Sequence, residues 1–468
     1  MNLQMIAATL LAASSFALPA VAAPLEIGIG THFGHNSGNL TIARGFYGTV
    51  TEPSTAGLVS VRDDISWGQS EIVKDQITLR DGGPKLKNLL TVIPTISRPM
   101  LILNHTNQYY DGGGRITSDE GRAAFSRFAA TILPNFPTAA YVEIGNEWNL
   151  TSVGAAMAAD YTKLVKATIP VIKALDAPKP KVIVGALADD YPDWAFARQL
   201  IAGGALDGAD GLSVHLYNHC MGTPTKITAE EMAARLDALH LHMGDAYANT
   251  PIYVTEFGWP VAPGSNGCAV AEDVGGLNTL RFLLEASVRP WIGGVWIYEM
   301  MNNGTPETEN TRYNSFGLVR QTSEIAITGN ALSTFVSISD ASVAAATKPM
   351  GCVMKDPLTK LIGLRPQTIS NDGNLRSAVF NDNGTQAIVI WNATTYPATV
   401  PGGSIKVYGA NAGSLVARSV CGGVSGGVIT SVSNSGADGT LNFNLDGGRP
   451  LVIEVAAGAV VTSVDLHD

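Results

Sequence analysis

Over the first two thirds of the chain, short apolar runs rich in Val and Ile alternate with longer segments whose apolar residues recur at helical spacing. Eight runs are predicted to be strands, over residues 25–30, 58–65, 99–104, 140–145, 181–187, 211–217, 251–256 and 293–298. Helices are predicted between them, for example over 118–133, 155–175, 228–243 and 270–287. Because helices must cover both faces of an all-parallel sheet, this alternation predicts a closed (β/α)8 TIM barrel, with an open doubly wound sheet as the alternative.

The pattern changes after about residue 339, where short alternating apolar and polar runs replace helical periodicity. Gly, Asn and Asp tolerate positive φ, and their clusters at 371–373, 381–384 and 436–439 predict hairpin turns. We therefore expect an α/β barrel over 24–341, followed by a small C-terminal antiparallel β-sandwich over 342–468.

The first 22 residues are predicted to be a signal peptide. Residues 5–23 are apolar or small, and Ala20 and Ala22 supply the small side chains that a signal peptidase accepts. The first four residues carry no Lys or Arg, so only the terminal amine gives a positive start. A buried first helix is disfavoured because Pro19 interrupts the run. We expect a secreted or periplasmic protein, and no later stretch approaches the roughly 20 apolar residues of a membrane span.

The charge of the chain limits its partners. Charged residues make up 15% of the sequence, and the formal net charge is −10. Nucleic acid and anionic membrane surfaces are themselves negative, so neither offers counter-charge to a chain without a basic cluster. We expect neither as a partner, and we expect a monomer without a cofactor. The charge does not select a substrate.

Four cysteines are present, namely Cys220, Cys268, Cys352 and Cys421. Their spacing lacks the close pairs of a zinc ribbon, and an export signal indicates an oxidising compartment. The first two follow predicted barrel strands, whereas the last two both lie in the C-terminal region. We therefore predict disulfides between Cys220 and Cys268 and between Cys352 and Cys421, with four buried free thiols as the alternative.

Two glutamates stand where predicted barrel strands end. Glu147 follows the fourth strand in Val-Glu-Ile-Gly-Asn-Glu-Trp, and Glu256 ends the seventh in Ile-Tyr-Val-Thr-Glu-Phe-Gly-Trp. The carboxyl ends of barrel strands form the rim on which active sites are built. Strands four and seven place the two carboxylates across the barrel mouth, and such a pair suggests cleavage of a glycosidic bond.

This arrangement resembles a known family. An Asn-Glu pair after strand four and a Glu at the end of strand seven are similar to the signature of clan A glycoside hydrolases. The segments 294–298, 302–304 and 316–318 resemble the eighth-strand region of families 39 and 5. The similarity covers roughly residues 25–340, and a C-terminal sandwich is a common companion in that clan.

The resemblance implies roles for four residues. Glu147 would be the general acid/base and Glu256 the nucleophile of a retaining double displacement. Arg62 would hydrogen-bond the nucleophile and keep it charged, although a surface ion pair with a neighbouring aspartate is an alternative. Asn146 would contact the sugar's 2-hydroxyl, although it is otherwise an ordinary turn residue after a strand.

Further residues near the predicted rim are candidates for sugar contacts. His215 and Tyr217 alternate at the end of strand six and so share a face. The resemblance gives Tyr217 a hydrogen bond to the nucleophile and His215 a place in the same network, although a core histidine is nearly as well supported. Trp296 on strand eight resembles the aromatic platform under the sugar. Additional candidates, for which core packing is an equal alternative, are Trp67, Asn104, His105, Trp148 and Trp259.

Competing interpretations use other residues. Glu143 lies deeper on the face of strand four that leads to Glu147, and Glu299 beyond strand eight could bind sugar hydroxyls. A metal-dependent barrel hydrolase would use the histidines His32, His35, His215 and His219, although a His-x-x-His pair does not place both rings on one face of a strand. A non-catalytic polysaccharide-binding protein is the remaining class.

The substrate is the least constrained feature. The fourth-strand motif reads Asn-Glu-Trp where many relatives have Asn-Glu-Pro, and residues 33–55 form a long segment expected to be a loop at the barrel mouth. We expect an endo-acting enzyme on an exported or cell-wall β-linked polysaccharide. An exo-acting β-glycosidase such as a β-xylosidase is the alternative.

Overall fold

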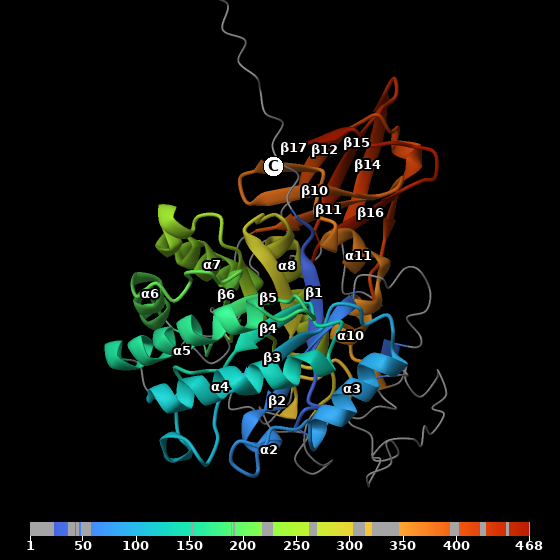
Figure 1. Cartoon of the computed structure of the whole chain (residues 1–468). Helices are drawn as coiled ribbons and strands as arrows, with labels where there is room; N and C mark the ends of the chain where they lie inside the picture. Colours follow the sequence, from blue (N-terminus) through green and yellow to red (C-terminus); the bar gives the residue numbers. More distant parts are fainter. Residues whose placement is uncertain are drawn as a thin grey trace, which may run out of the picture.

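A computed structural model gives the architecture of the chain (Figure 1). The structure describes residues 23–35, 43, 46–47, 58–150, 154–188, 190, 192–217, 228–261, 269–302, 314–320, 346–393, 402–421, 427–445 and 449–467. The predicted signal peptide therefore lies outside the described residues and stays a prediction.

Eight parallel strands close into a barrel in sequence order, as the sequence predicts. They are β1 (Glu26–Gly30), β2 (Leu58–Ser66), β3 (Met100–Asn104), β4 (Tyr141–Ile144), β5 (Lys181–Leu187), β6 (Gly211–Leu216), β7 (Ile252–Phe257) and β8 (Ile292–Ile297). Closure is made by β8 pairing in parallel with β1. All eight predicted strands are confirmed, and the open-sheet alternative is wrong.

Helices surround the barrel (Figure 1). They are α2 (Trp67–Ser70), α3 (Gly82–Val92), α4 (Asp119–Ile132), α5 (Ala155–Lys173), α6 (Ala195–Ala202), α7 (Ala229–Met243) and α8 (Glu272–Ser287). At α4, Ser118 caps the start by accepting a hydrogen bond from the Gly121 amide, which confirms the predicted start. None of the helices in the part of the chain covered by the structure combines the length and apolarity needed to cross a bilayer.

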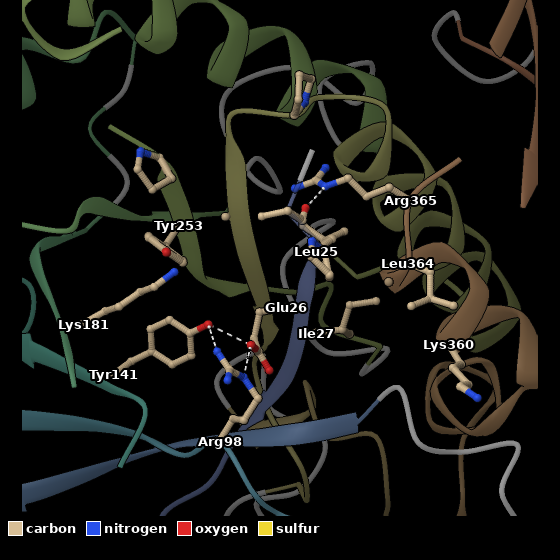
Figure 2. Close-up of a pocket in the computed structure, with 16 residues that line it drawn as sticks. Leu25, Glu26, Ile27, Arg98, Tyr141, Lys181, Tyr253, Lys360, Leu364 and Arg365 are labelled. Atoms are coloured by element: carbon tan, nitrogen blue, oxygen red, sulfur yellow. Dashed lines mark hydrogen bonds and ion pairs between the residues drawn. The ribbon is translucent and has the colours of Figure 1, made fainter. Parts of the chain in front are cut away.

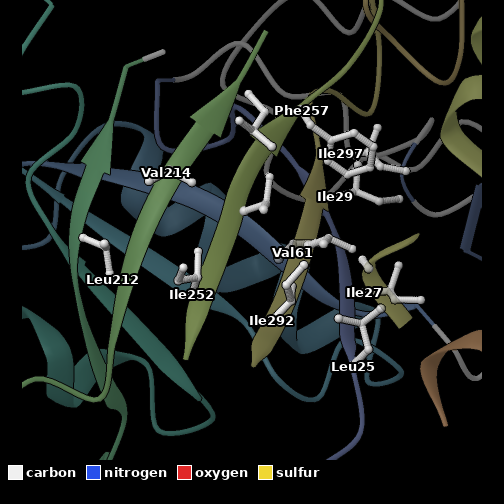
Figure 3. Packing of buried hydrophobic residues seen from close by; sticks show 14 of the residues in the cluster. Leu25, Ile27, Ile29, Val61, Leu212, Val214, Ile252, Phe257, Ile292 and Ile297 are labelled. Carbon is white, nitrogen blue, oxygen red and sulfur yellow. The ribbon is translucent and has the colours of Figure 1, made fainter. Parts of the chain in front are cut away.

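Alternate residues of each strand pack against the helices. Figure 3 shows such residues on β1, β2, β6, β7 and β8, among them Ile29 on β1, Val61 on β2, Val214 on β6 and Ile297 on β8. All four are fully buried. Because strand residues alternate between faces, the remaining positions point into the barrel, where polar residues are also found.

The barrel interior contains a small cluster of large buried side chains, Met100, Tyr141, Ile183, Tyr253 and Trp296. The indole of Trp296 lies against β1, where a Cβ on Gly28 would come within 2.2 Å of its Nε1. Glycine at that position therefore leaves the space that the indole fills.

The C-terminal region is an antiparallel sandwich, as predicted. One sheet has the order β13-β16-β11-β10-β9 and the other the order β14-β15-β12-β17. The strands are β9 (Thr368–Asp372), β10 (Leu375–Asp382), β11 (Thr385–Asn392), β12 (Gly402–Tyr408), β13 (Leu415–Arg418), β14 (Val428–Ser435), β15 (Asp438–Asn444), β16 (Leu451–Val455) and β17 (Ser463–His467). The three predicted turns join β9 to β10, β10 to β11 and β14 to β15.

Two short helices, α10 (Pro349–Lys355) and α11 (Pro357–Gly363), precede the sandwich and pack against α8. A disulfide joins Cys352 of α10 to Cys421, with the Cα atoms 5.7 Å apart, which confirms that predicted pair. Cys220 and Cys268 lie outside the described residues, so their pairing stays a prediction. The predicted domain boundary near 342 is also not covered.

A buried carboxylate ties the barrel to the sandwich. Glu285 on α8 is 1% exposed and accepts hydrogen bonds from Arg289 at 2.6 Å, Arg376 of β10 at 2.8 Å and the Trp391 indole of β11 at 2.8 Å. One acidic group thus satisfies donors from both domains. Such a group is costly to remove because Arg376 and the Trp391 indole lose their partner and Arg289 loses one of its two carboxylates.

The Glu285→Ala substitution should therefore lower the free energy of unfolding by about 3–5 kcal/mol. A matched control is Asp237→Ala, because Asp237 also pairs with Arg289 but is 47% exposed. That control should cost less than about 1 kcal/mol. Urea unfolding of both variants measures the difference, and equal losses would show that Glu285 does not join the domains in this way.

Candidate active site

The carboxyl ends of β2, β4, β6 and β7 bring together most of the residues that the sequence singled out. Arg62 lies on β2, Glu143 on β4, His215 on β6 and Glu256 on β7. Asn146, Glu147 and Tyr217 follow directly after their strands. The four residues on the strands are buried in the upper barrel interior, whereas Asn146, Glu147 and Tyr217 are half-buried at the rim.

Arg62 is the centre of this group. Its Nε donates to Glu143 at 2.5 Å, its Nη1 donates to Glu256 at 2.6 Å, and its Nη2 donates to the Asn146 Oδ1 at 2.8 Å. Burial lowers the pKa of Arg62, but the adjacent carboxylates of Glu143 and Glu256 raise it by more, so the guanidinium stays charged.

The alternative surface ion pair of Arg62 with a neighbouring aspartate is wrong. Asp63 instead accepts hydrogen bonds from the Thr31 hydroxyl and from the Phe33 and Gly34 amides. Asp64 is paired with His35 at 3.1 Å. Arg62 is 3% exposed and points into the barrel, since strand residues alternate between faces.

Glu256 is held in its ionised form. Its Oε1 accepts from Arg62, and its Oε2 accepts from the Tyr217 hydroxyl at 2.6 Å. Burial raises the pKa of this carboxyl, but His215, Arg62 and the Tyr217 hydrogen bond together lower it by more, so the pKa falls below its ordinary value. The predicted contacts of Arg62 and Tyr217 with Glu256 are thus present.

Glu147 stands on a strained turn. Gly145 has a φ of 78° and Glu147 a φ of 48°, a left-handed conformation that is unfavourable for a residue with a side chain. The amide of Glu147 donates to the Ala186 carbonyl at 2.7 Å, which fixes the turn against β5. Backbone strain that the surroundings enforce is common at functional sites, because it presents one side chain in a fixed direction.

A tyrosine from α5 supports the same turn. The hydroxyl of Tyr161 donates to the Ile144 carbonyl at 2.6 Å and accepts from the Gly185 amide at 2.8 Å. It therefore joins the last residue of β4 to the middle of β5 immediately below Glu147. The ring is fully buried.

His215 connects the two glutamates. Its Nδ1 lies 3.0 Å from a Glu147 oxygen and 3.5 Å from a Glu256 oxygen, and its Nε2 lies 3.3 Å from Nη2 of Arg62. Because arginine can only donate, Nε2 accepts and Nδ1 carries the proton toward Glu147. One atom of each of Glu147, His215 and Glu256 lies within 4.8 Å of the other two.

Atoms at this spacing could also bind a metal ion, but the positive charge of Arg62 already balances the negative charge of Glu256. Arg62 supplies a positive charge 2.6 Å from Glu256, and both oxygens of that carboxylate accept hydrogen bonds. Two histidines of the alternative metal-dependent site have other partners, because His32 pairs with Glu299 at 2.7 Å and His35 pairs with Asp64. His219 lies outside the described residues.

The structure corrects the prediction for Trp296. Its indole is fully buried in the barrel interior, 5.6 Å from the Tyr141 ring, and its Nε1 donates to Ser60 at 2.9 Å. It cannot offer a face to a sugar. Strand periodicity predicts that Trp296 points inward but not how deep it lies, and it is one layer below the rim.

Three further tryptophans are core residues. Trp67, Trp148 and Trp259 are all fully buried, and they stack on or contact Tyr110, His105 and Phe257, respectively. The subsite role expected for Trp148 and Trp259 is therefore wrong.

The aromatic groups beside Glu256 are instead Tyr217, Tyr298 and Phe316. Their ring centroids lie 5.6–6.1 Å apart in edge-to-face contacts. Tyr298 was not among the candidate residues predicted from the sequence, although its position two residues after Trp296 places it on the same face and one layer closer to the mouth. Tyr298 and Tyr217 are half-buried and so are partly accessible at the rim.

The predicted third-strand residues lie at the same rim. The Asn104 amide donates to Asp64 at 3.4 Å, beside the Asp64–His35 pair. His105 packs its ring 4.7 Å from Trp148. Burial and the nearby Arg115 lower the pKa of His105 to about 4, so it is neutral at physiological pH.

Glu299 is fully buried against His32 and is not available to sugar hydroxyls.

Comparisons with solved structures support this fold. The chain is similar to a family 39 glycoside hydrolase from the gut symbiont Bacteroides cellulosilyticus WH2, with 17% identity, a TM-score of 0.64 and coverage of 92% of this chain and 81% of that one. It is also similar to a family 39 enzyme from Xanthomonas axonopodis pv. citri, with 15% identity, a TM-score of 0.57 and coverage of 93% and 96%.

A third similar structure is a family 30 endoxylanase from Clostridium papyrosolvens C71, with 10% identity, a TM-score of 0.55 and coverage of 94% of this chain and 98% of that one. No protein-family model and no curated protein sequence matches the chain. At these identities the likeness establishes a shared fold, namely a barrel followed by a sandwich.

The His32–Glu299 pair makes stability depend on pH. Burial lowers the pKa of His32, but Glu299 raises it by more, to about 9. The folded state thus binds this proton more tightly than the unfolded state does. The stabilisation is complete below the ordinary histidine pKa of about 6.5 and is lost as pH rises through about 9.

We predict that Glu299→Gln lowers the free energy of unfolding by roughly 3 kcal/mol at pH 6 and by little at pH 10. Urea unfolding of the wild type and the variant at both pH values measures this difference. A loss of the same size at both pH values would mean that the ion pair is not its source.

Proposed function

We propose that this chain is a retaining glycoside hydrolase of clan A that cleaves a β-linked polysaccharide. One observation carries the proposal: oxygens of Glu147 and Glu256 lie within 4.8 Å of each other and of His215. Retaining enzymes hold their two carboxyl groups about 5–5.5 Å apart, whereas inverting enzymes need about 6.5–9.5 Å to admit a water molecule. The shared fold with family 39 and family 30 structures supports the same assignment.

In the first step, Glu256 acts as the nucleophile. One of its oxygens forms a bond to the anomeric carbon as the bond to the leaving oxygen breaks, and the carboxyl of Glu147 gives its proton to that oxygen. The lowered pKa of Glu256 fits this role because only the ionised carboxylate carries the electron pair that forms the new bond.

In the second step, Glu147 acts as a base. It takes a proton from water while the water oxygen bonds to the anomeric carbon, and the bond between that carbon and Glu256 breaks. Glu256 returns to its ionised form and Glu147 to its protonated form. Two inversions at one carbon retain the configuration. Glu147 is more exposed than Glu256, with 26% against 11% of its side chain accessible, which suits a group that meets water.

The aromatic and polar residues at the rim are proposed to bind sugar. Tyr217 and Tyr298 offer partly exposed rings beside Glu256, and Asn146 and His105 offer neutral polar groups on the side of Glu147. Neutral donors and acceptors suit sugar hydroxyls. We propose internal cleavage of an exported or cell-wall polysaccharide, and we propose that the predicted signal peptide directs the enzyme out of the cytoplasm.

Removing each glutamate should have different consequences. Glu147→Ala should lower kcat by about 10²–10⁴-fold on substrates with poor leaving groups, because it removes general acid–base catalysis. Glu256→Ala should abolish hydrolysis. Azide should rescue both variants, and NMR should detect a β-glycosyl azide from Glu147→Ala and an α-glycosyl azide from Glu256→Ala.

The configurations follow from the face that azide attacks, which is the face opposite the bond that it displaces. Glu143→Gln is a matched control, because Glu143 also contacts Arg62 but is fully buried below the site. Azide should not rescue it. A Glu256→Ala variant that hydrolyses polysaccharide like the wild type, or a wild type that binds polysaccharide without any cleavage, would contradict the proposal and favour a binding protein.

Tyr217 should set the lower pH limit of activity. Its hydroxyl donates to ionised Glu256, so Tyr217→Phe should raise the pKa of that carboxyl. The acidic limb of kcat/KM should then move upward by about 1 pH unit. Tyr298→Phe is the control, because Tyr298 contacts the Tyr217 ring without a hydrogen bond to Glu256. A shift of the basic limb alone would refute this role.

A further inference from the structure

A second polar cavity lies at the opposite end of the barrel (Figure 2). Its volume is about 510 Å³, and it is formed by the amino ends of β1, β4, β5, β7 and β8 together with α11. Two of its lining residues, Tyr141 and Tyr253, pack against the buried Trp296, and neither Glu147 nor Glu256 lines it. Ligand sites commonly occupy about 300–1,000 Å³, so the cavity can accept a sugar-sized molecule.

Basic side chains outnumber acidic ones around the cavity. Four basic side chains line it, namely Arg98, Lys181, Lys360 and Arg365, and one acidic side chain, Glu26. Arg365 is only 7% exposed and donates to backbone carbonyls. Lys360 is paired with Asp382 and Arg98 with Glu26. Lys181 is exposed and forms no ion pair with any residue that the structure describes. A concave surface with this charge concentrates anions.

Lys181 and Arg98 flank one aromatic ring. The Lys181 Nζ lies 5.9 Å and the Arg98 Cζ 5.5 Å from the centroid of the Tyr141 ring. Arg98 also donates to the Tyr141 hydroxyl at 2.9 Å and remains 47% exposed. The two cations are thus held in place at the cavity wall while their charges stay accessible to an anion.

Glu26 contributes an acceptor without a partner. Its Oε2 accepts from Arg98 and from the Tyr141 hydroxyl, both at 2.7 Å. Its Oε1 is buried and has no hydrogen-bond partner among the residues that the structure describes, and the side chain is only 8% exposed. A buried carboxylate oxygen without a donor is costly, and Figure 2 shows this carboxylate at the cavity wall. A ligand hydroxyl would satisfy it.

We propose that this cavity is a binding site for an acidic sugar, namely a uronic acid residue. Its carboxylate would lie against Lys181 and Arg98, and one of its hydroxyls would donate to the free oxygen of Glu26. A simple anion such as phosphate meets the charge but carries no ring of hydroxyls to fill the space. A neutral sugar meets Glu26 but leaves Lys181 without a counter-charge among the described residues. The site does not depend on the proposed chemistry at the other end of the barrel.

Titration calorimetry of the full-length protein with sodium glucuronate, glucose and inorganic phosphate tests the proposal. Glucuronate should bind more tightly than either of the others, and raising the salt concentration should weaken it. Lys181→Ala should weaken glucuronate binding at least about tenfold, which corresponds to about 1.4 kcal/mol. Lys181→Glu should abolish it. Because Lys181 is exposed, both variants should fold, which circular dichroism can check.

Two controls separate this site from the proposed active site. Lys163→Ala removes an exposed lysine on α5 and should leave glucuronate binding unchanged. Glu256→Gln should also leave it unchanged, even if it abolishes hydrolysis. Glucuronate binding that Lys181→Glu does not alter, or equal affinity for glucuronate, glucose and phosphate, would overturn the proposal without bearing on catalysis.

Discussion

The upper half of the barrel depends on one buried cation. The guanidinium of Arg62 joins β2 to the carboxylates of Glu143 on β4 and Glu256 on β7 and to Asn146 after β4. Two carboxylates in a barrel interior would otherwise pay a large desolvation penalty or take up protons. Because arginine presents a planar set of donors, it fixes the direction of each partner as well as its charge. The geometry of the site follows from that set of contacts.

This constraint explains why the two glutamates differ. Glu256 is buried, accepts from Arg62 and Tyr217, and is held ionised. Glu147 has no contact with Arg62 among those that the structure shows, stands on a left-handed turn supported by Tyr161, and faces His215. The two carboxyl groups, both at the carboxyl ends of the strands, thus have different surroundings. Two carboxyl groups with different roles in catalysis require such a difference.

The residues of this site that stand at the ends of strands could be predicted from the sequence. Parallel strands of alternating pattern place Glu147, Glu256 and Tyr217 at one rim, and the residues after each strand are the ones exposed there. The depth of Trp296 in the barrel could not be predicted. The alternation of strand residues shows which face of the sheet a side chain is on, but it does not show which residues of the neighbouring strands lie beside it. The contact of Tyr161 with β4 and β5 could not be predicted either, because helix periodicity does not reveal where one hydroxyl meets a strand carbonyl. The Cys352–Cys421 pair was predictable because both residues lie in the C-terminal region.

The central claim is that Glu256 forms a bond to sugar and Glu147 assists. Mass spectrometry of the Glu147→Ala variant, quenched during turnover of an activated aryl glycoside, tests it most directly, because loss of the base slows release of the covalent intermediate. If Glu256 is the nucleophile, a peptide that contains Glu256 will be heavier by one glycosyl unit. A glycosylated peptide that contains another carboxylate instead, or turnover with inverted configuration and no adduct, would contradict it.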